Sequence, residues 1–283
     1  MEGLVTPEIR SAAFFDLDKT LIPGSSLFLL ARGLYQRDIF RVRDILRFGW
    51  GQTMFRLRGE ATRGMDMSRE STLDFVVGRK QEELIEWGNE IVEEEILPRV
   101  YEDIVRVINQ HRKKGDLTFL VTAAPIELAK TIAEALSMTG AVGTESELDD
   151  EGNYTGRLVG GVTHGPEKAK AAAELASRHR VEMVECSAYS DSINDLPLLE
   201  SVGHPHAVNP DRELRRTAIN RGWPIHELRT RRRALLVGIP AGLGGAGLFS
   251  SGLAFGVALE KRRRAREQER RLVNRLTAPF RGR

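Results

Sequence analysis

A short apolar run near the start of the chain ends in two closely spaced acids. Residues 12–15 are Ala-Ala-Phe-Phe, and Asp16 and Asp18 follow directly. The run predicts a buried strand of the kind found inside parallel sheets. If the strand continued through them, both acids would point the same way. Like charges that close repel unless a cation or a raised pKa relieves them, so the pair indicates a divalent metal, a nucleophile beside an acid, or both.

The composition restricts the class of protein. A chain of 283 residues can hold one sizeable α/β domain with an insertion or a tail. Its 42 basic and 40 acidic residues nearly balance, so no specific nucleic-acid partner is expected. The single cysteine, Cys186, excludes an internal disulfide framework and a cysteine-rich zinc site. Its neighbours, residues 183–189, look like a strand, which predicts a structural thiol.

Strands and helices alternate along most of the chain. Apolar runs and helical periodicity predict strands at 117–121 and 184–189, a hairpin around 149–153, and helices at 84–96, 100–114, 126–136 and 167–176. Pro98 is expected to stop one helix, and Pro125 fits the first turn of another. Such alternation with buried strands predicts a doubly wound parallel sheet.

Polar residues stand where three of these strands end. Asp16, Thr122 and Asp191 each follow directly after a predicted strand. In a doubly wound sheet the active site lies beyond the carboxyl ends of the strands. We therefore expect these three side chains to meet at one edge of the sheet.

Four motifs, in this order, resemble those of a known family. They are Asp16-Leu17-Asp18-Lys19-Thr20, Thr122 at a strand end, Lys168 in Gly165-Pro166-Glu167-Lys168, and Asp191-Ser192-Ile193-Asn194-Asp195. Together they resemble the haloacid dehalogenase (HAD)-like phosphatases, and they look most like the branch that includes phosphoserine phosphatase. The resemblance covers roughly residues 12–228 and implies a Rossmann-like α/β core.

The resemblance implies a catalytic and metal-binding role for three aspartates. Asp16 matches the nucleophile that forms an aspartyl-phosphate, as an ionised carboxylate can. Asp18 matches the general acid that protonates the leaving alcohol and then activates water. Asp16, Asp18 through its carbonyl, and Asp191 match the ligands of Mg²⁺, a hard cation that prefers oxygen.

The remaining motif residues match phosphate-binding and supporting positions. Thr122 matches the hydroxyl that binds a phosphoryl oxygen, and Lys168 matches the lysine that neutralises charge during transfer. Asn194 and Asp195 would tune the metal shell or orient Asp191 and Lys168. Taken singly, Thr122 could instead cap a helix, and Lys168 could be a solvated residue with Lys170 as its rival.

The resemblance also predicts the domain organisation. Residues 1–23 and 98–228 would form the catalytic core, residues 24–97 a helical cap, and residues 229–283 a C-terminal segment with a basic tail. In phosphoserine phosphatases an acid shortly after the first motif recognises the substrate amine. Residues 23–26 here are Pro-Gly-Ser-Ser, without an acid, which disfavours phosphoserine itself.

One segment predicts membrane association. Residues 234–259 carry no charge over 26 positions, and arginine-rich stretches flank both ends. That length can span a bilayer as a helix. Pro240 and Gly244-Gly245 leave a re-entrant hairpin as the alternative, and two basic flanks do not set an orientation. Residues 1–11 lack the apolar stretch that a signal peptide needs. The catalytic part is therefore expected in the cytoplasm.

These features together predict a membrane-tethered, Mg²⁺-dependent phosphomonoester hydrolase. The tether favours a membrane-proximal or lipid-derived phosphate, since it raises the local concentration at the bilayer. A soluble phosphate stays an alternative substrate. Two other functions stay open: a phosphotransferase using the same aspartyl-phosphate, and a non-catalytic scaffold that recruits partners through the basic tail, residues 261–283.

Overall fold

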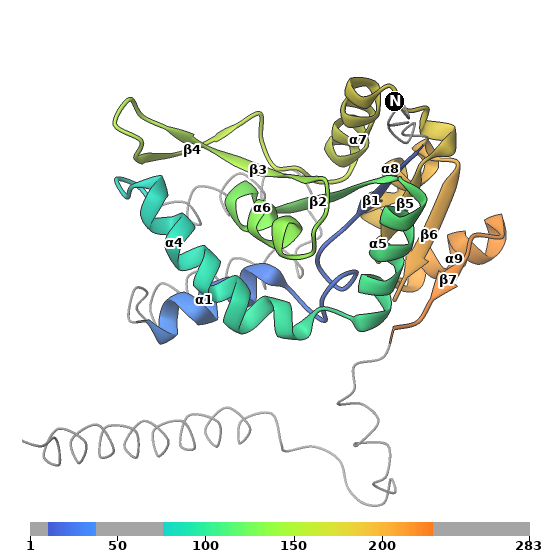
Figure 1. Ribbon diagram of the computed structural model, residues 1–283, viewed down its shortest axis with the longest axis horizontal. Coiled ribbons are helices and arrows are strands. Elements are labelled where there is room, and N and C mark those ends of the chain that lie inside the picture. Colours follow the sequence, from blue (N-terminus) through green and yellow to red (C-terminus); the bar gives the residue numbers. More distant parts are fainter. Residues whose placement is uncertain (1–10, 38–75, 229–283) are drawn as a thin grey trace, which may run out of the picture. The chain divides into compact units, whose positions relative to one another are not determined.

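The computed structural model describes residues 11–37 and 76–228, which form a layered α/β structure (Figure 1). One sheet holds seven strands in the order β4-β3-β2-β1-β5-β6-β7. The strands are β1 (Ala12–Phe15), β2 (Leu117–Pro125), β3 (Gly140–Leu148), β4 (Tyr154–Val159), β5 (Ser187–Ser190), β6 (His204–Val208) and β7 (Ile225–His226). Every neighbouring pair is parallel except the β3–β4 hairpin. The predicted α/β class with a largely parallel sheet is confirmed.

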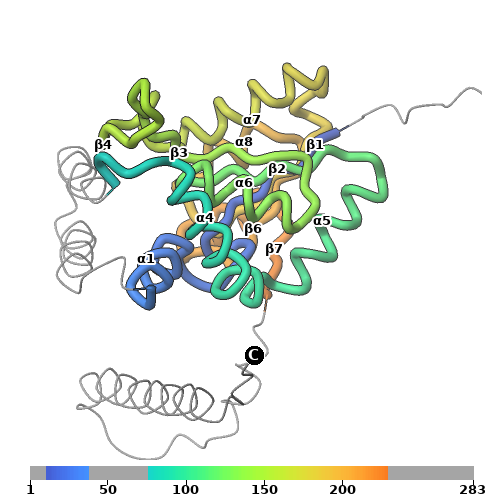
Figure 2. Tube along the Cα trace, turned by 60° about the vertical axis from the view of Figure 1, so that its left-hand side comes forward, coloured from blue at the N-terminus to red at the C-terminus, as the bar shows by residue number. Residues whose placement is uncertain are grey.

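Helices cover both faces of this sheet (Figure 2). The α-helices of the described residues are α1 (Ser26–Gln36), α4 (Gln81–Ile91), α5 (Glu102–Lys114), α6 (Ile126–Ala135), α7 (Pro166–His179), α8 (Leu196–Ser201) and α9 (Arg212–Arg221). Side chains of α5 and α6 pack in one apolar cluster, and those of α7, α8 and α9 pack in a second. The two clusters lie on opposite faces of the sheet.

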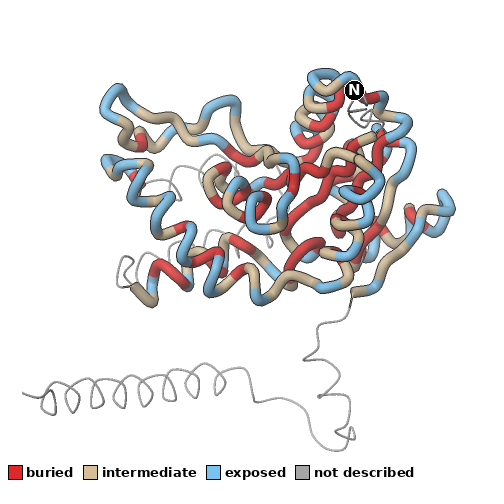
Figure 3. The backbone as a smooth tube through the Cα atoms, in the orientation of Figure 1, coloured by how far each residue is buried: buried red, intermediate tan, exposed pale blue. Residues whose placement is uncertain are grey.

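Strand β1 shows how four residues supply both cores. All four side chains are buried, as the red segments of Figure 3 show for the centre of the sheet. Ala12 and Phe14 belong to the cluster with α7 to α9, whereas Ala13 and Phe15 belong to the cluster with α5 and α6. This is the two-residue alternation of a strand covered on both faces. The apolar run at 12–15 is therefore the centre of the fold.

Two helices of the predicted cap pack closely against each other. Gly33 of α1 faces Ile91 of α4, and Leu34 and Ile91 share a small buried cluster. Arg37, after α1, forms ion pairs with Glu90 and Glu94. Residues 38–75 lie outside the described residues, so the predicted boundaries of the cap stay a prediction.

Several element boundaries differ from those the sequence predicts. Strand β2 continues to Pro125, which is the N-cap of α6 rather than part of its first turn. Gly143 on β3 allows this extension, because a Cβ there would lie 2.7 Å from the Ala124 carbonyl oxygen. Residues 183–185, predicted as strand, form a 3₁₀ turn.

The helix predicted over 84–96 also ends differently. Helix α4 stops at Ile91, a π-helical turn covers Val92–Ile96, and a 3₁₀ turn covers Leu97–Arg99. Pro98 is tolerated early in that turn because the first N–H groups of a helix have no internal partner. Cys186 is buried as predicted, and burial raises the pKa of its thiol.

Within residues 11–37 and 76–228, no helix is long and apolar enough to cross a bilayer. The segment that carries the membrane prediction, residues 234–259, lies outside these ranges. Membrane association, the tail and the cytoplasmic location of the core therefore stay predictions.

Replacing Gly33 by alanine tests the packing of α1 on α4. A Cβ atom at Gly33 would lie 2.6 Å from Cγ1 of Ile91, which is fully buried. We expect Gly33→Ala to lower the free energy of unfolding by about 1–3 kcal/mol, because overpacking strains its neighbours. Denaturant unfolding of the full chain measures this change.

Gly88→Ala, in α4, is the matched control. A Cβ there would meet no atom within 4 Å, and alanine has the higher helix propensity. We expect this variant to be neutral or more stable than the parent. Equal effects of the two substitutions would contradict the close packing of the two helices.

Candidate active site

The order of the strands brings three sequence motifs to one place. Strand β1 lies between β2 and β5, and the chain builds the sheet first on one side of β1 and later on the other. Asp16 follows β1, Asp191 follows β5, and Thr122 lies on β2. The Asp16 N–H donates a hydrogen bond to the Tyr189 carbonyl at 2.9 Å, which fixes Asp16 beside the end of β5. The place where the strand order changes direction is called the switch point, and α/β sheets bind their ligands there.

A buried lysine joins two of the predicted acids. The Lys168 Nζ lies 2.5 Å from Asp16 Oδ1 and 2.7 Å from Asp195 Oδ2. Lys168 stands in the first turn of α7 because Gly165 adopts a positive φ and Pro166 opens the helix. All three side chains are at least nine-tenths buried. Lys170, the rival candidate, is exposed, so the structure brings Lys168 to Asp16.

Burial and charge set the protonation of this cluster. Burial raises the pKa of Asp16 to about 7, although the charge of Lys168 opposes the shift. Burial works to lower the pKa of Lys168, but the charges of Asp16 and Asp195 outweigh it and raise the pKa instead. Lys168 is therefore a permanent cation held between two carboxylates.

Asp195 holds the other side of the lysine. Its Oδ2 accepts hydrogen bonds from Lys168 and from the Ser190 hydroxyl, the latter at 2.7 Å. This contact is compatible with the predicted role of Asp195 in orienting Lys168, which stays a prediction. Asn194 is exposed, and its N–H donates to Ser192 Oγ at 3.3 Å. The supporting role expected for Asn194 stays a prediction.

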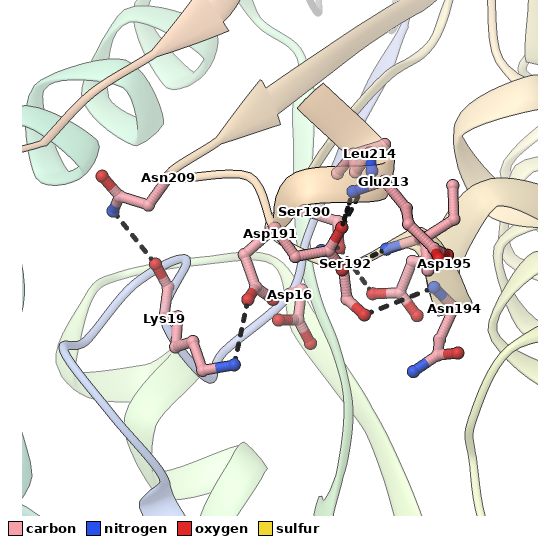
Figure 4. Close-up of polar contacts among 12 residues, drawn as sticks. Asp16, Lys19, Ser190, Asp191, Ser192, Asn194, Asp195, Asn209, Glu213 and Leu214 are labelled. Atoms are coloured by element: carbon pink, nitrogen blue, oxygen red, sulfur yellow. Dashed lines mark hydrogen bonds and ion pairs between the residues drawn. The ribbon is translucent and has the colours of Figure 1, made fainter. Parts of the chain in front are cut away.

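Asp191 is buried beside a second, more exposed lysine (Figure 4). The Lys19 Nζ lies 3.5 Å from Asp191 Oδ2. Burial raises the pKa of Asp191 to about 6, while Lys19 lowers it. The Asp191 carbonyl accepts the N–H of Asp211 at 2.8 Å, and the Asn209 side chain donates to the Lys19 carbonyl at 3.1 Å. The loop after β6 thereby fixes both Asp191 and the turn that follows Asp16.

Asp18 is held differently from Asp16. The strand ends at Phe15 and does not continue through the two aspartates, so the condition under which both would point the same way is not met. Asp18 forms an isolated bridge with Ile22, and its Oδ1 accepts the N–H of Ser26 at 2.8 Å. Asp18 is only half-buried, whereas Asp16 is buried.

Thr122 is buried on β2 and does not cap a helix. Its Oγ1 accepts the N–H of Ala124 at 3.1 Å, whereas the N-cap of α6 is Pro125. The hydroxyl can still donate its own proton to a phosphoryl oxygen. Its predicted phosphate-binding role is compatible with this position but stays a prediction.

Three contributors to the site were not predicted as site residues: Lys19, Ser190 and Ser26. Lys19 and Ser190 stand inside or next to the motifs but carry no distinguishing signal of their own. Ser26 follows a Pro-Gly turn that brings it back to Asp18, a contact no spacing rule predicts. Among the described residues, no three His, Cys, Asp or Glu side chains cluster closely enough to hold a metal. The predicted ligand set has only two carboxylates and a carbonyl, so this finding does not test it.

Comparison with known proteins identifies the family. A family model described as haloacid dehalogenase-like hydrolase matches residues 13–200. Phosphoserine phosphatase SerB1 of Mycobacterium tuberculosis is 42% identical over 260 residues, which are 92% of this chain and 83% of that protein.

Two solved structures show the same fold. A protein of unknown function from Bordetella pertussis Tohama I superposes with a TM-score of 0.69 at 31% identity, covering 77% of this chain and 99% of that one. A phospho-aspartyl intermediate analogue of phosphoserine phosphatase gives a TM-score of 0.54 at 16% identity, covering 82% of this chain and 100% of that one. The latter shares the fold.

The chain therefore belongs to the haloacid dehalogenase-like hydrolase family, in the branch that resembles phosphoserine phosphatase. The prediction that it is a phosphatase of this family is confirmed.

Removing the buried cation tests the charge balance of the site. We expect Lys168→Met to lower kcat/KM for p-nitrophenyl phosphate by about 10²–10³-fold, because the site loses a fixed positive charge. Lys170→Met, two residues further along α7 and exposed, is the control and should keep the parent activity. Steady-state phosphatase assays measure both variants. Similar activity in the two variants would contradict a functional role for Lys168.

Proposed function

We propose that this protein is a Mg²⁺-dependent phosphomonoester hydrolase that works through a phosphoryl group carried by Asp16. The observation that supports it most is the contact of Asp16 with the buried cation Lys168 at 2.5 Å. Buried ion pairs rarely add stability, so a contribution to folding does not by itself account for this pair. Here the pair stands at the switch point of the sheet, where α/β folds bind their ligands.

In the proposed reaction, a carboxylate oxygen of Asp16 attacks phosphorus and the bond from phosphorus to the alcohol oxygen breaks. The electron pair of that bond goes to the alcohol oxygen, which takes a proton from Asp18. Asp18 then removes a proton from water, which attacks phosphorus and frees Asp16. Lys168 and the Thr122 hydroxyl would bind the phosphoryl oxygens throughout.

The residues at the site fit a magnesium ion. Burial raises the pKa of both Asp16 and Asp191, because each carboxylate has lost the solvation that water would give to its charged form. Oxygen ligands of this kind suit Mg²⁺. The carboxylates of Asp16 and Asp191 and the carbonyl of Asp18 would hold the ion. When bound, it supplies positive charge to the phosphoryl oxygens.

The substrate class is proposed to be a small phosphomonoester. The name of the Mycobacterium tuberculosis relative points to phosphoserine, whereas the absence of an acid at residues 23–26 points away from it. A lipid-derived phosphate rests on residues 234–259 alone, and a phosphotransferase would use the same Asp16 chemistry. These alternatives differ in substrate and in the acceptor of the phosphoryl group, so one set of assays separates them.

A substrate panel with the full-length chain tests this proposal. We expect release of inorganic phosphate from soluble phosphomonoesters, phosphoserine included, that stops with EDTA and returns with excess Mg²⁺. Vesicles containing a lysophospholipid phosphate or phosphatidylglycerol phosphate form the lipid arm. Turnover in the lipid arm alone would contradict the soluble substrate class, and activity unaffected by EDTA would contradict the metal.

An added alcohol acceptor distinguishes hydrolysis from transfer. A hydrolase should release one inorganic phosphate for each substrate consumed, whether or not glycerol is present. A phosphorylated acceptor as the main product would favour the phosphotransferase instead.

A further inference from the structure

The proton donor of the proposed reaction is held by a helix outside the predicted core. Ser26 is the first residue of α1, and its main-chain N–H donates to Asp18 Oδ1 at 2.8 Å. The first N–H groups of a helix have no internal partner and favour a negative charge. Asp18, eight residues upstream, therefore provides the acceptor for one of these N–H groups.

The local chain is built to make this contact. Gly24 adopts φ +97°, and its carbonyl accepts the N–H of Lys19 at 3.2 Å, which closes a tight loop between the first motif and α1. Ser25, the N-cap of α1, is extended, and its side chain makes no capping hydrogen bond. The carboxylate of Asp18 thus supplies an acceptor at the start of α1, where the N-cap side chain supplies none.

The contact comes from the main chain of Ser26 and not from its side chain. Ser26 is 1% exposed, and its Oγ has no hydrogen-bond partner among residues 11–37 and 76–228. The hydroxyl therefore contributes nothing to holding Asp18. Any effect on Asp18 must pass through the N–H.

An N–H donor at one carboxylate oxygen also decides where an acid keeps its proton. Since Oδ1 accepts the N–H of Ser26, the proton of a neutral Asp18 resides on Oδ2. A proton donor must present that oxygen to the leaving group with little freedom to rotate. A fixed hydrogen bond at Oδ1 provides this restraint.

We propose that the main-chain N–H of Ser26 is a positioning group for Asp18, so that α1 completes the proton donor. This inference rests on the proposed function, in which Asp18 protonates the leaving alcohol. It places one necessary contact of the catalytic acid in the segment that begins the predicted cap. Proton donation then depends on α1 being seated where the structure shows it.

Ser26→Pro removes this one donor. Proline is favoured at the first position of a helix, where its missing N–H is unneeded for the helix itself. The residue before a proline prefers an extended backbone, and Ser25 already has φ −107° and ψ 126°. The amide-to-ester variant, with the α-hydroxy analogue of serine at position 26, removes the same N–H without a ring and serves as the second variant.

Two matched substrates report on proton donation. Phenyl phosphate and p-nitrophenyl phosphate have similar shapes, but phenolate is the more basic leaving group and needs the proton more. We expect both N–H-deleted variants to lose at least about 10-fold in kcat/KM for phenyl phosphate and about 2-fold or less for p-nitrophenyl phosphate. Ser26→Ala keeps the N–H and should keep the parent ratio of the two values.

Asp18→Asn separates the failure of this inference from failure of the proposed function. If Asp18 is the proton donor, Asp18→Asn should lose more kcat/KM for phenyl phosphate than for p-nitrophenyl phosphate. The difference should be larger than in the N–H-deleted variants. A parent-like ratio in Asp18→Asn would overturn the proposed role of Asp18. A selective loss in Asp18→Asn, with equal losses or none in both N–H-deleted variants, would overturn the role of Ser26 alone.

Discussion

The ion pair between Asp16 and Lys168 is the interaction on which the rest of the site depends. Two carboxylates, Asp16 and Asp195, are buried within hydrogen-bonding distance of one ammonium group. Removing a charge from water is costly, and such a cluster persists only when each charge has a partner. Lys168 supplies that partner to both acids. A phosphoryl group or a divalent cation then meets a site whose charges are already arranged.

The sheet provides the rigidity that this arrangement needs. Phe15 and Tyr189 pair across β1 and β5, and their rings stack at 4.6 Å between centroids, so the ends of both strands are fixed laterally. Tyr189 also stacks on His206 of β6 at 4.5 Å. This row of rings crosses the three strands that precede Asp16, Asp191 and the loop with Asn209. Groups held by packed strands keep their geometry better than groups on loops.

The core of the site could be predicted from the sequence, because its residues stand directly after buried apolar runs. Asp16, Thr122 and Asp191 were located by that rule alone, whereas the choice of Lys168 over Lys170 needed the family resemblance. The contacts of Lys19 with Asp191 and of Ser190 with Asp195 escaped prediction, since they join side chains whose meeting depends on loop geometry. Residues 183–185 were misassigned because apolar content does not distinguish a strand from a 3₁₀ turn.

The most direct test of the central claim is the identity of the residue that carries the phosphoryl group. The full-length protein is mixed with substrate and Mg²⁺, quenched in acid within the first turnovers and reduced with borohydride, which converts an aspartyl-phosphate to homoserine. We predict homoserine at position 16 in the parent, and none at any position in Asp16→Asn, which should also lose turnover. Homoserine at another aspartate, or an Asp16→Asn variant with parental turnover, would contradict Asp16 as the nucleophile.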